Sequence, residues 1–460
     1  MSEETGVGLV VFTRDLRVRD HPALNAAIAG SQRVATAFIL DSELLATSHG
    51  SPNRLRFLID CLHDLRSSLR ERNGELLIRH GQWVDQVVAL VDECGASAVH
   101  LSRDVSAYSK KRNAELRSKL AATTCEVHEH EGITVLRPGA TRPGSGGFWK
   151  VFTPYYNKWI EAPWRQVLPP PKSMATLETL NPGEIPKLEE ITQKQPSEEL
   201  PPGGETAGLD RLKVWAKNSL ESYEDNRNDV ALDDTSRISA YIHFGCLSPL
   251  EVATRLLGRQ GAGPFIRQLC WRDFYHQALD ARPEISQSDY RTRGDIWRVD
   301  EADAEAWREG NTGYPLVDAA MRQLRAEGFM HNRARMVVAS FLTKDLYLDW
   351  RIGAAHFMEF LVDGDVANNQ LNWQWNAGTG ADSNPNRIFN PTVQSTRFDP
   401  DGSYIRRYLP VLAGVPAPLI HDPDVETRLR VGYPLPIVDH KQAIAAYRAQ
   451  LASYRSQGTE

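Results

Sequence analysis

The sequence predicts two domains of different fold classes: an α/β N-terminal domain with a doubly wound parallel sheet, joined by a long linker to an all-α C-terminal domain. Short apolar runs alternate with amphipathic runs over residues 1–132, which is typical of parallel strands covered by helices on both faces. Prolines and glycines gather within residues 133–205, as in an interdomain linker. Helical periodicity dominates residues 206–460, where β-rich runs disappear.

In the α/β domain, five apolar runs of strand length are separated by runs with helical spacing. We expect strands at Gly8–Phe12, Val34–Leu40, Glu75–His80, Ala96–Leu101 and Glu126–Glu129. We expect the helices between them at Pro22–Ala29, Asn53–Arg72, Val84–Cys94 and Ser109–Leu120.

A doubly wound sheet binds its ligands beyond the carboxyl ends of its strands. The segments predicted to lie there contain Arg14, Asp15, Arg17 and Asp104. A surface ion-pair cluster is the competing interpretation of Arg14, Asp15 and Arg17. No GxGxxG or Walker sequence follows the first strand, so neither a dinucleotide site nor a P-loop is predicted.

Composition, net charge and cysteine spacing limit the ligands that this chain can bind and the compartment in which we expect it. The chain has 460 residues, of which 41% are hydrophobic and 24% charged, as in ordinary globular proteins. Its net charge of −6 means that DNA binding would need a local basic patch. Five scattered cysteines form no CxxC pair, so we expect no metal site and no iron–sulfur cluster. Met1–Glu4 is acidic and no apolar run reaches membrane length, so we expect a cytoplasmic protein, nucleoid-associated if bacterial.

In the helical domain, the segment Asp363–Trp375 has the composition of a ligand site. Two acids flank Gly364, three asparagines follow, and Trp373 and Trp375 close the segment. The carboxylates suit the hydroxyl groups of a ribityl or adenosine moiety, and an amide can serve a heteroaromatic ring edge because it both donates and accepts. A surface turn that leads into a helix with two core tryptophans is the competing interpretation.

A second segment, Thr235–Ser239, supplies hydroxyls and backbone amides at a predicted helix start, which suits a phosphate group. An ordinary N-cap explains it equally well. Tyr223 and Arg227 lie one turn apart just upstream.

Two further helical stretches present polar faces. Gln268, Trp271, Arg272 and Tyr275 are spaced i, i+3, i+4, i+7 and therefore share one face. Such a face suits stacking and hydrogen bonding to an extruded base, or a domain interface.

The segment Met330–Met336 is also predicted to be helical. We expect Asn332, Arg335 and Met336 on one face of this helix and Arg333 towards the opposite face. His331 is more typical of a structural histidine than of a catalyst.

Taken in this order, these stretches resemble the photolyase/cryptochrome family of flavoproteins, and most of all its class I cyclobutane pyrimidine dimer photolyases. The similarity extends over nearly the whole chain, from Phe12–Arg17 to Asn390–Gln394. The segments that carry it are Thr235–Ser239, Trp271–Phe274, Gly313–Pro315, Met330–Arg335 and Asp363–Trp375.

The resemblance implies an antenna domain at residues 1–132, a linker at 133–205, and a helical domain at 206–460 that holds a U-shaped FAD. It assigns FAD binding to Tyr223, Thr235, Ser236, Arg237, Ile238, Ser239, Arg335, Asp363, Gly364, Asp365 and Asn369. It assigns photoreduction of the flavin to Trp373, Trp350 and Trp297. It assigns DNA and lesion contacts to Arg227, Gln268, Trp271, Arg272, Tyr275, Asn332, Arg333, Met336 and Gln394.

The implied activity is that of a deoxyribodipyrimidine photo-lyase, a carbon–carbon lyase driven by light. Excited reduced FAD gives one electron to a cyclobutane pyrimidine dimer, the ring splits, and the electron returns. The lesion would be flipped out of the duplex, as described for enzymes that act on bases, photolyases among them. The expected partner is UV-damaged DNA, bound by a monomer with no membrane and no obligate protein partner. Asn369 beside the flavin, and Gln268 and Met336 beside the lesion, would complete the catalytic set.

One position departs from the dimer enzymes, which usually carry glutamate where this chain has Gln268. Glutamine is typical there of (6-4) photoproduct enzymes and animal cryptochromes, but those proteins carry histidines at the positions of Met336 and Asn332. We therefore predict dimer repair, with a yield that Gln268 lowers because an amide is a poor proton source.

Three other functions remain as alternatives: (6-4) photoproduct repair, a cryptochrome-like blue-light photoreceptor, and, from the residues without the resemblance, a dehydrogenase. The long tail that many photoreceptors append does not follow Gln394 here, and the missing glycine fingerprint argues against a dehydrogenase.

A second, antenna chromophore is also implied by the resemblance. Folate-binding members usually carry an Asn-Glu pair where this chain has Ser106 and Ala107, whereas Arg54 and Asp104 match residues of members that bind 8-hydroxy-5-deazaflavin. We expect the deazaflavin, with methenyltetrahydrofolate or no antenna as alternatives.

Overall fold

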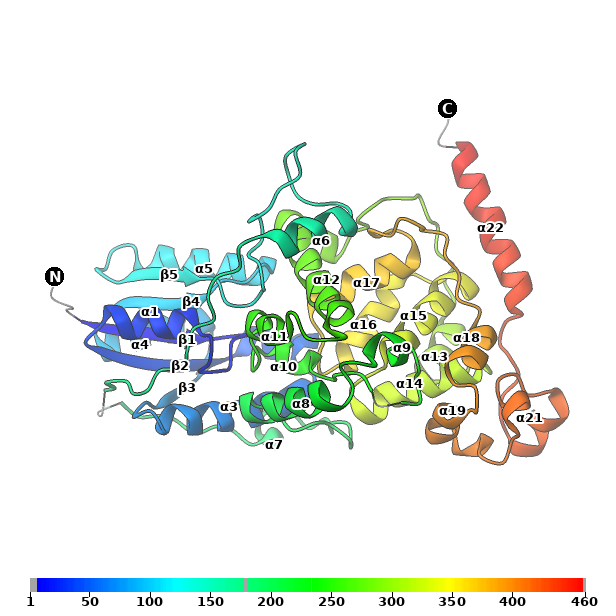
Figure 1. Ribbon diagram of the computed structural model, residues 1–460, viewed down its shortest axis with the longest axis horizontal. Helices are drawn as coiled ribbons and strands as arrows, with labels where there is room; N and C mark the ends of the chain where they lie inside the picture. The colour runs from blue at the N-terminus through cyan, green and yellow to red at the C-terminus, as the bar shows by residue number, and fades with distance from the viewer. Residues whose placement is uncertain (1–5, 178–179, 233, 458–460) are drawn as a thin grey trace. The chain divides into compact units, whose positions relative to one another are not determined.

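The computed structural model describes residues 6–177, 180–232 and 234–457. The acidic segment Met1–Glu4, discussed above as an N-terminus without export features, lies outside them. The chain forms two compact units, and each is described by itself (Figure 1).

The first unit comprises Met1–Pro196, Pro201–Glu221 and Ser236–Pro283, and the second comprises Ser197–Leu200, Ser222–Thr235 and Glu284–Glu460. The first therefore contains the sheet, most of the predicted linker and the first helices after it. The domain boundaries predicted from composition, after residues 132 and 205, stay predictions.

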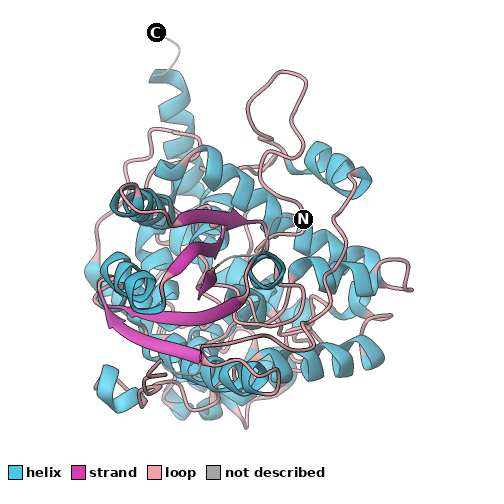
Figure 2. Cartoon of the chain, turned by 90° about the vertical axis from the view of Figure 1, so that its left-hand side faces the viewer, coloured by secondary structure: helices cyan, strands magenta, loops and turns pink. Residues whose placement is uncertain are grey.

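A single five-stranded parallel sheet forms the centre of the first unit, with strand order β3-β2-β1-β4-β5 (Figure 2). The chain moves outward from β1 to β3 and then crosses back to β4, as in a doubly wound sheet. The predicted fold class is confirmed, and the predicted strands agree with the observed ones to within two residues at each end. The strands are β1 Val7–Phe12, β2 Arg33–Asp41, β3 Leu76–Gly81, β4 Ala96–Ser102 and β5 Glu126–His130.

Side chains alternate across the sheet and pack against helices on both faces. Leu9 pairs in register with Ala35 of β2 and Val99 of β4, and these three side chains join one core with α4 and α5. On the opposite face, Gly8 lies against α1, where an added Cβ would come within 2.6 Å of Ser31 Oγ. The helices of the sheet region are α1 Pro22–Gly30, α2 Ser42–Leu45, α3 Pro52–Arg70, α4 Trp83–Cys94 and α5 Ala107–Leu120.

The cluster predicted at the end of β1 is buried, so its interpretation as a surface ion-pair group is wrong for Asp15 and Arg17. Arg17 donates to the backbone oxygens of Arg19, Asp20, Gly132 and Gly245 at 2.8–3.0 Å. A guanidinium has five N–H donors and no acceptor, so one side chain can hydrogen-bond to several backbone carbonyl groups at once. Arg17 therefore acts as an internal support for three loops.

Asp15 pairs with buried His21 at 3.0 Å, and His21 caps α1 by accepting from the Leu24 amide. Burial opposes ionisation of Asp15, but the charge and hydrogen bond of His21, with hydrogen bonds from Ser102 and the Thr13 amide, lower its pKa. These partners therefore stabilise the charged form of Asp15 in the interior.

The aromatic part of the predicted linker is docked rather than free. Helix α6 (Phe152–Glu161) buries Phe152 and Trp159, and the indole of Trp159 donates to Asp273 Oδ2 at 2.9 Å. Asp273 also accepts from the Leu136 amide at 2.9 Å, and Gln277 exchanges two hydrogen bonds with the Trp149 backbone. Burial raises the pKa of Asp273 to about 6, and these donors oppose the shift.

Apart from the loops of the linker, helices account for most of the rest of the first unit, and they dominate the second. The further helices of the first unit are α7 Leu188–Ile191, α8 Glu205–Asn218, α10 Ser239–His243, α11 Pro249–Leu256 and α12 Ala262–Ala281. Those of the second are α9 Tyr223–Asn226, α13 Glu301–Glu309, α14 Pro315–Glu327, α15 Asn332–Ser340, α16 Trp350–Phe360, α17 Val366–Ala377, α18 Pro391–Phe398, α19 Ser403–Tyr408, α20 Ala417–Ile420, α21 Val425–Val431 and α22 His440–Gln457.

The second unit is built around one core that contains the fully buried Trp307, Phe341 and Trp350. A π-helical turn, Phe341–Asp345, follows α15 directly. Among the residues the structure describes, no helix combines the length and apolar content that a bilayer crossing needs.

Candidate functional site

An ion pair joins α15 to the loop before α17 in the second unit. Arg335 donates from Nη2 to both carboxylate oxygens of Asp363, at 2.9 and 3.2 Å, and from Nε to the Met330 oxygen. The Asp363 side chain is only 6% exposed, whereas Arg335 is 26% exposed. Asp363 is therefore held as an oriented carboxylate just before the start of α17. The ligand site predicted for this segment stays a prediction.

Asp365 and Asn369 extend this site along α17. Asp365 caps the helix by accepting from the backbone and side-chain nitrogens of Asn368, at 2.8 and 2.7 Å. Asn369 Nδ2 donates to the Ala354 oxygen of α16 at 2.9 Å, which fixes the plane of the amide. Its Oδ1 accepts no hydrogen bond from the described part of the chain. An oriented amide with an available acceptor, beside two carboxylates, fits the ring edge and hydroxyl groups of a flavin.

The predicted phosphate segment is divided between the units, with Thr235 in the second and Ser236–Ser239 in the first. A helix starts at Ser239 as expected, but its N-cap is Ile238 and no side chain caps it, so the ordinary N-cap interpretation is wrong. Arg237 has φ +51°. A non-glycine residue in the left-handed region is strained, and such strain gathers at functional sites.

Tyr223 begins the short helix α9 and is buried, which raises the pKa of its phenol. Arg227 follows at the C-cap of the same helix and is half-buried. The expected spacing of one turn between them is therefore realised.

The three tryptophans assigned to photoreduction all lie in the second unit and differ in exposure. Trp373 and Trp350 are buried, at 2% and 0% exposure, whereas Trp297 is partly exposed. Trp373 of α17 packs on α16 at Gly353, where an added Cβ would fall 2.1 Å from the indole. Gly353 lies one helical turn after Trp350 on α16. Because glycine has no side chain, the Trp373 ring can approach the backbone of this turn closely.

Polar groups fix the outer two indoles. Trp350 Nε1 donates to Asp289 at 2.9 Å, and the Trp297 ring lies 5.1 Å from that of Tyr347. Tyr347 in turn donates to buried Asp295 at 3.0 Å.

The polar face predicted on α12, in the first unit, is only partly presented to solvent. Gln268 is exposed and Trp271 half-buried, but Tyr275 is buried. Arg272 is 11% exposed and donates to the Ile133 oxygen at 2.5 Å. Arg272 therefore ties α12 to the linker, and its contact with DNA stays a prediction.

The face predicted on α15 forms as expected. Asn332 Nδ2 lies 3.8 Å from Met336 Sδ, and Asn332 is exposed. His331 is buried at the N-cap and accepts from the Arg333 amide at 3.1 Å, which is the structural role favoured for it.

Arg333 belongs to a group of arginines of which the sequence analysis found only two. Burial, with repulsion from Arg397, Arg227 and Arg387, lowers the pKa of Arg333. Arg333 stacks over Phe398 at 4.5 Å and donates to Asn228 at 2.7 Å; among the described residues it forms no ion pair. Such a set of cations suits a polyanion.

Two members of the group, Arg387 and Arg397, were missed. Arg397 lies one turn after the predicted DNA contact Gln394 on α18, so helical spacing could have identified it. Gln394 has a buried Oε1 that finds no hydrogen-bond donor within the described residues.

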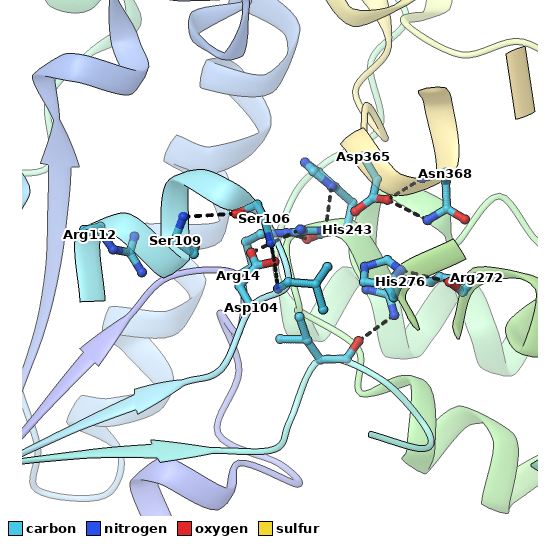
Figure 3. A network of polar contacts seen from close by, with 12 residues as sticks. Arg14, Asp104, Ser106, Ser109, Arg112, His243, Arg272, His276, Asp365 and Asn368 are labelled. Carbon is cyan, nitrogen blue, oxygen red and sulfur yellow. Dashed lines mark hydrogen bonds and ion pairs between the residues drawn. The ribbon is translucent and has the colours of Figure 1, made fainter. Parts of the chain in front are cut away.

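The two residues matched to an antenna lie in the first unit and already have protein partners. Asp104 accepts from the amides of Val105 and Ser106 at 2.6 and 3.2 Å and from Arg14 at 3.3 Å (Figure 3). Arg54 is buried and donates to the Ser48 and His49 oxygens. Asp104 follows the end of β4 by two residues, at the edge where a ligand is expected, whereas Arg54 lies in the first turn of α3.

Comparisons with known proteins bear on both halves of the chain. The family described as "DNA photolyase" matches residues 9–173, and "FAD binding domain of DNA photolyase" matches residues 265–453. A deoxyribodipyrimidine photo-lyase of Streptomyces griseus is 44% identical, covering 96% of this chain and 98% of the relative.

Two solved structures are similar over nearly their whole length. A bacterial class III photolyase from Agrobacterium tumefaciens has a TM-score of 0.90 at 33% identity, with 99% of both chains covered. A cryptochrome of Synechocystis sp. PCC6803 has a TM-score of 0.89 at 30% identity, covering 98% of this chain and 100% of its own.

A parallel α/β domain followed by a helical FAD-binding domain defines a class of two-domain flavoproteins. Within that class, this chain belongs to the photolyase/cryptochrome family. The family and the FAD-binding domain predicted from the sequence are thereby confirmed.

Proposed function

We propose that this protein is a deoxyribodipyrimidine photo-lyase that repairs cyclobutane pyrimidine dimers in DNA under light. The observation that carries the proposal is the oriented group Arg335–Asp363, Asp365 and Asn369, which fits a flavin within a chain of this family. When bound and reduced, FAD supplies on excitation the electron that splits the dimer. The residues named below hold the flavin, the lesion and the DNA.

The flavin is held by acceptors that the fold orients before it binds. Asp363 is fixed by Arg335, Asp365 by the start of α17, and Asn369 by the Ala354 oxygen. Because these groups are ordered in advance, binding loses little side-chain entropy. Contacts with the rest of the cofactor are assigned to Tyr223, Thr235 and Ser236–Ser239 because the resemblance to the family implies them.

Trp373, Trp350 and Trp297 keep the flavin reduced by conducting electrons inward. Trp373 and Trp350 are buried, whereas Trp297 is partly exposed and is therefore reachable by a reductant in solution. Within the described part of the chain, none of the three indoles has a hydrogen bond or ring contact with the arginine group around Arg333, so photoreduction and DNA binding can be separated by mutation.

The substrate is the dimer because the side chains beside the lesion lack a proton donor. Met336 and Asn332 stand where (6-4) enzymes carry histidines, and the Met336–Asn332 contact fills that side of α15. Gln268 is exposed on α12 and can donate a hydrogen bond to a lesion carbonyl, but it is a poor proton source.

We expect the purified, reduced protein to repair a defined dimer oligonucleotide under blue light and not in the dark. A matched oligonucleotide with a (6-4) photoproduct should stay unrepaired. Repair is measured by the restored absorbance and by chromatography of the oligonucleotides. Repair of the (6-4) substrate alone would show that the protein is a (6-4) photolyase. Repair of neither substrate would favour a photoreceptor function, as in a cryptochrome.

Replacement of Trp271 by alanine should weaken binding to dimer-containing DNA much more than binding to undamaged DNA. Stacking of a base on an aromatic ring contributes about 1–3 kcal/mol, which is roughly 5- to 150-fold in dissociation constant. Fluorescence anisotropy with two labelled duplexes measures both constants. An equal loss for both duplexes would remove Trp271 from lesion recognition.

The DNA backbone is met by the arginine group Arg227, Arg333, Arg387 and Arg397. Arg333 lies near the charges of Arg227, Arg387 and Arg397, and such a local concentration of cations lets a chain with net charge −6 bind a polyanion. Its affinity therefore falls as salt rises, because phosphate contacts release counterions. The protein acts as a monomer in the cytoplasm, with DNA as its partner.

The antenna chromophore is 8-hydroxy-5-deazaflavin, bound near Arg54 and Asp104. The absence of an Asn-Glu pair at Ser106–Ala107 argues against folate. Mass spectrometry of the extracted chromophores distinguishes deazaflavin, methenyltetrahydrofolate and no antenna.

A further inference from the structure

The half-buried indole of Trp271 has one face covered by another ring of the first unit. Phe152 of α6 lies parallel to it, with 3.7 Å between the ring centroids and 2° between the planes. Phe274, which is fully buried, meets both rings edge-on, at 5.7 Å from Trp271 and 5.8 Å from Phe152. The Tyr275 ring lies 5.5 Å from Trp271 and is tilted by 36°, and among the described residues no second parallel ring stacks on the indole. One face of the indole is therefore used within the protein.

This stack is held by its surroundings, because aromatic pairs left to themselves prefer offset or edge-to-face arrangements over a face-to-face one. The guanidinium of Arg267, one turn before Trp271 on α12, lies 4.8 Å over the Phe152 ring. Since the indole occupies the other side at 3.7 Å, Arg267, Phe152 and Trp271 form three successive layers. Asp273 and Gln277 anchor the linker segments on either side of Phe152, as described above.

We propose that Phe152 is a positioning residue for lesion recognition: it fixes the Trp271 indole so that the opposite face is ready to stack on a flipped dimer. This inference rests on the lesion role proposed for Trp271. It assigns to the linker helix α6 a part in substrate selection. A fixed indole is ordered before the substrate arrives, so less conformational entropy is lost on binding.

The test compares Phe152→Leu with Phe152→Tyr and with Tyr155→Leu. Tyr155 lies on the same helix, is equally buried and contacts Phe274 at 5.7 Å, but has no ring contact with Trp271. Tyr155→Leu thus controls for a general loosening of α6. We expect Phe152→Leu to weaken binding of a dimer duplex about tenfold with little effect on an undamaged duplex. Phe152→Tyr, which keeps the ring, should restore the selectivity, and Tyr155→Leu should retain it.

Non-additivity supplies a second readout that a purely structural role would not give. Because Phe152 acts through Trp271, the double variant Phe152→Leu/Trp271→Ala should bind the dimer duplex as Trp271→Ala does. Additive losses, or unchanged selectivity in Phe152→Leu while Trp271→Ala loses it, would overturn this inference and leave the proposed function standing. A wild-type protein that does not prefer the dimer duplex would instead overturn the proposed function.

Discussion

Trp373→Phe should strongly slow the photoreduction of oxidised FAD and leave dimer repair by pre-reduced protein largely intact. Phenylalanine is much harder to oxidise than tryptophan, so the innermost position of the proposed chain can no longer supply an electron. The substitution removes part of a buried side chain packed against Gly353, and its cost stays below the roughly 3–5 kcal/mol of a Trp→Ala replacement. The measurement is the rate at which flavin absorbance is lost under blue light with an external reductant.

Trp307→Phe is the matched control for this variant. Trp307 is buried in the same core, and its ring meets that of Trp373 edge-on at 5.9 Å, yet it is not assigned to the chain. We expect it to photoreduce normally. Equal slowing in both variants would mean that core packing, rather than electron supply, sets the rate, and normal photoreduction in Trp373→Phe would exclude the assignment.

The α/β half was predictable from sequence because its signals are local. Apolar runs such as Val34–Leu40, bounded by turns, become strands wherever parallel neighbours bury both faces. The polar spacing on α15 likewise placed Asn332 beside Met336, since positions four apart share a helical face. Such predictions need only the period of the element.

The features that were missed depend on partners distant in the chain. From the sequence, Asp15 and Arg17 resemble a surface charge cluster. In the folded chain Arg17 is buried because it donates to the carbonyl groups of Gly132 and Gly245, which are distant in the sequence. The stack of Phe152 on Trp271 joins positions more than one hundred residues apart. Helical spacing from Gln394 points to Arg397 on α18, but Arg387 lies in the loop before that helix, and both approach Arg333 of α15 only in the folded chain. No periodicity in the sequence encodes that approach or the contacts of Arg17 and Phe152.

Arg335→Ala should release FAD from the protein. The substitution removes both hydrogen bonds to Asp363 and leaves a carboxylate that is 6% exposed without its cation. Hydrogen bonds to charged groups contribute about 1.5–3 kcal/mol, so we expect a loss near 2–3 kcal/mol, roughly 30- to 150-fold in the dissociation constant of FAD. The constant is measured by titrating the apoprotein with FAD and following quenching of flavin fluorescence.

Arg333→Ala separates the two roles that α15 is proposed to combine. It is the same substitution two residues away on the same helix, but Arg333 contacts Asn228 and Phe398 rather than Asp363. This variant should keep FAD and lose affinity for DNA, with a weaker dependence of that affinity on salt because one phosphate contact is gone. Release of FAD from both variants to the same extent would mean that α15 has unfolded. Retention of FAD by Arg335→Ala would show that Asp363 does not need its partner to hold the flavin, and would remove the ion pair from the cofactor site.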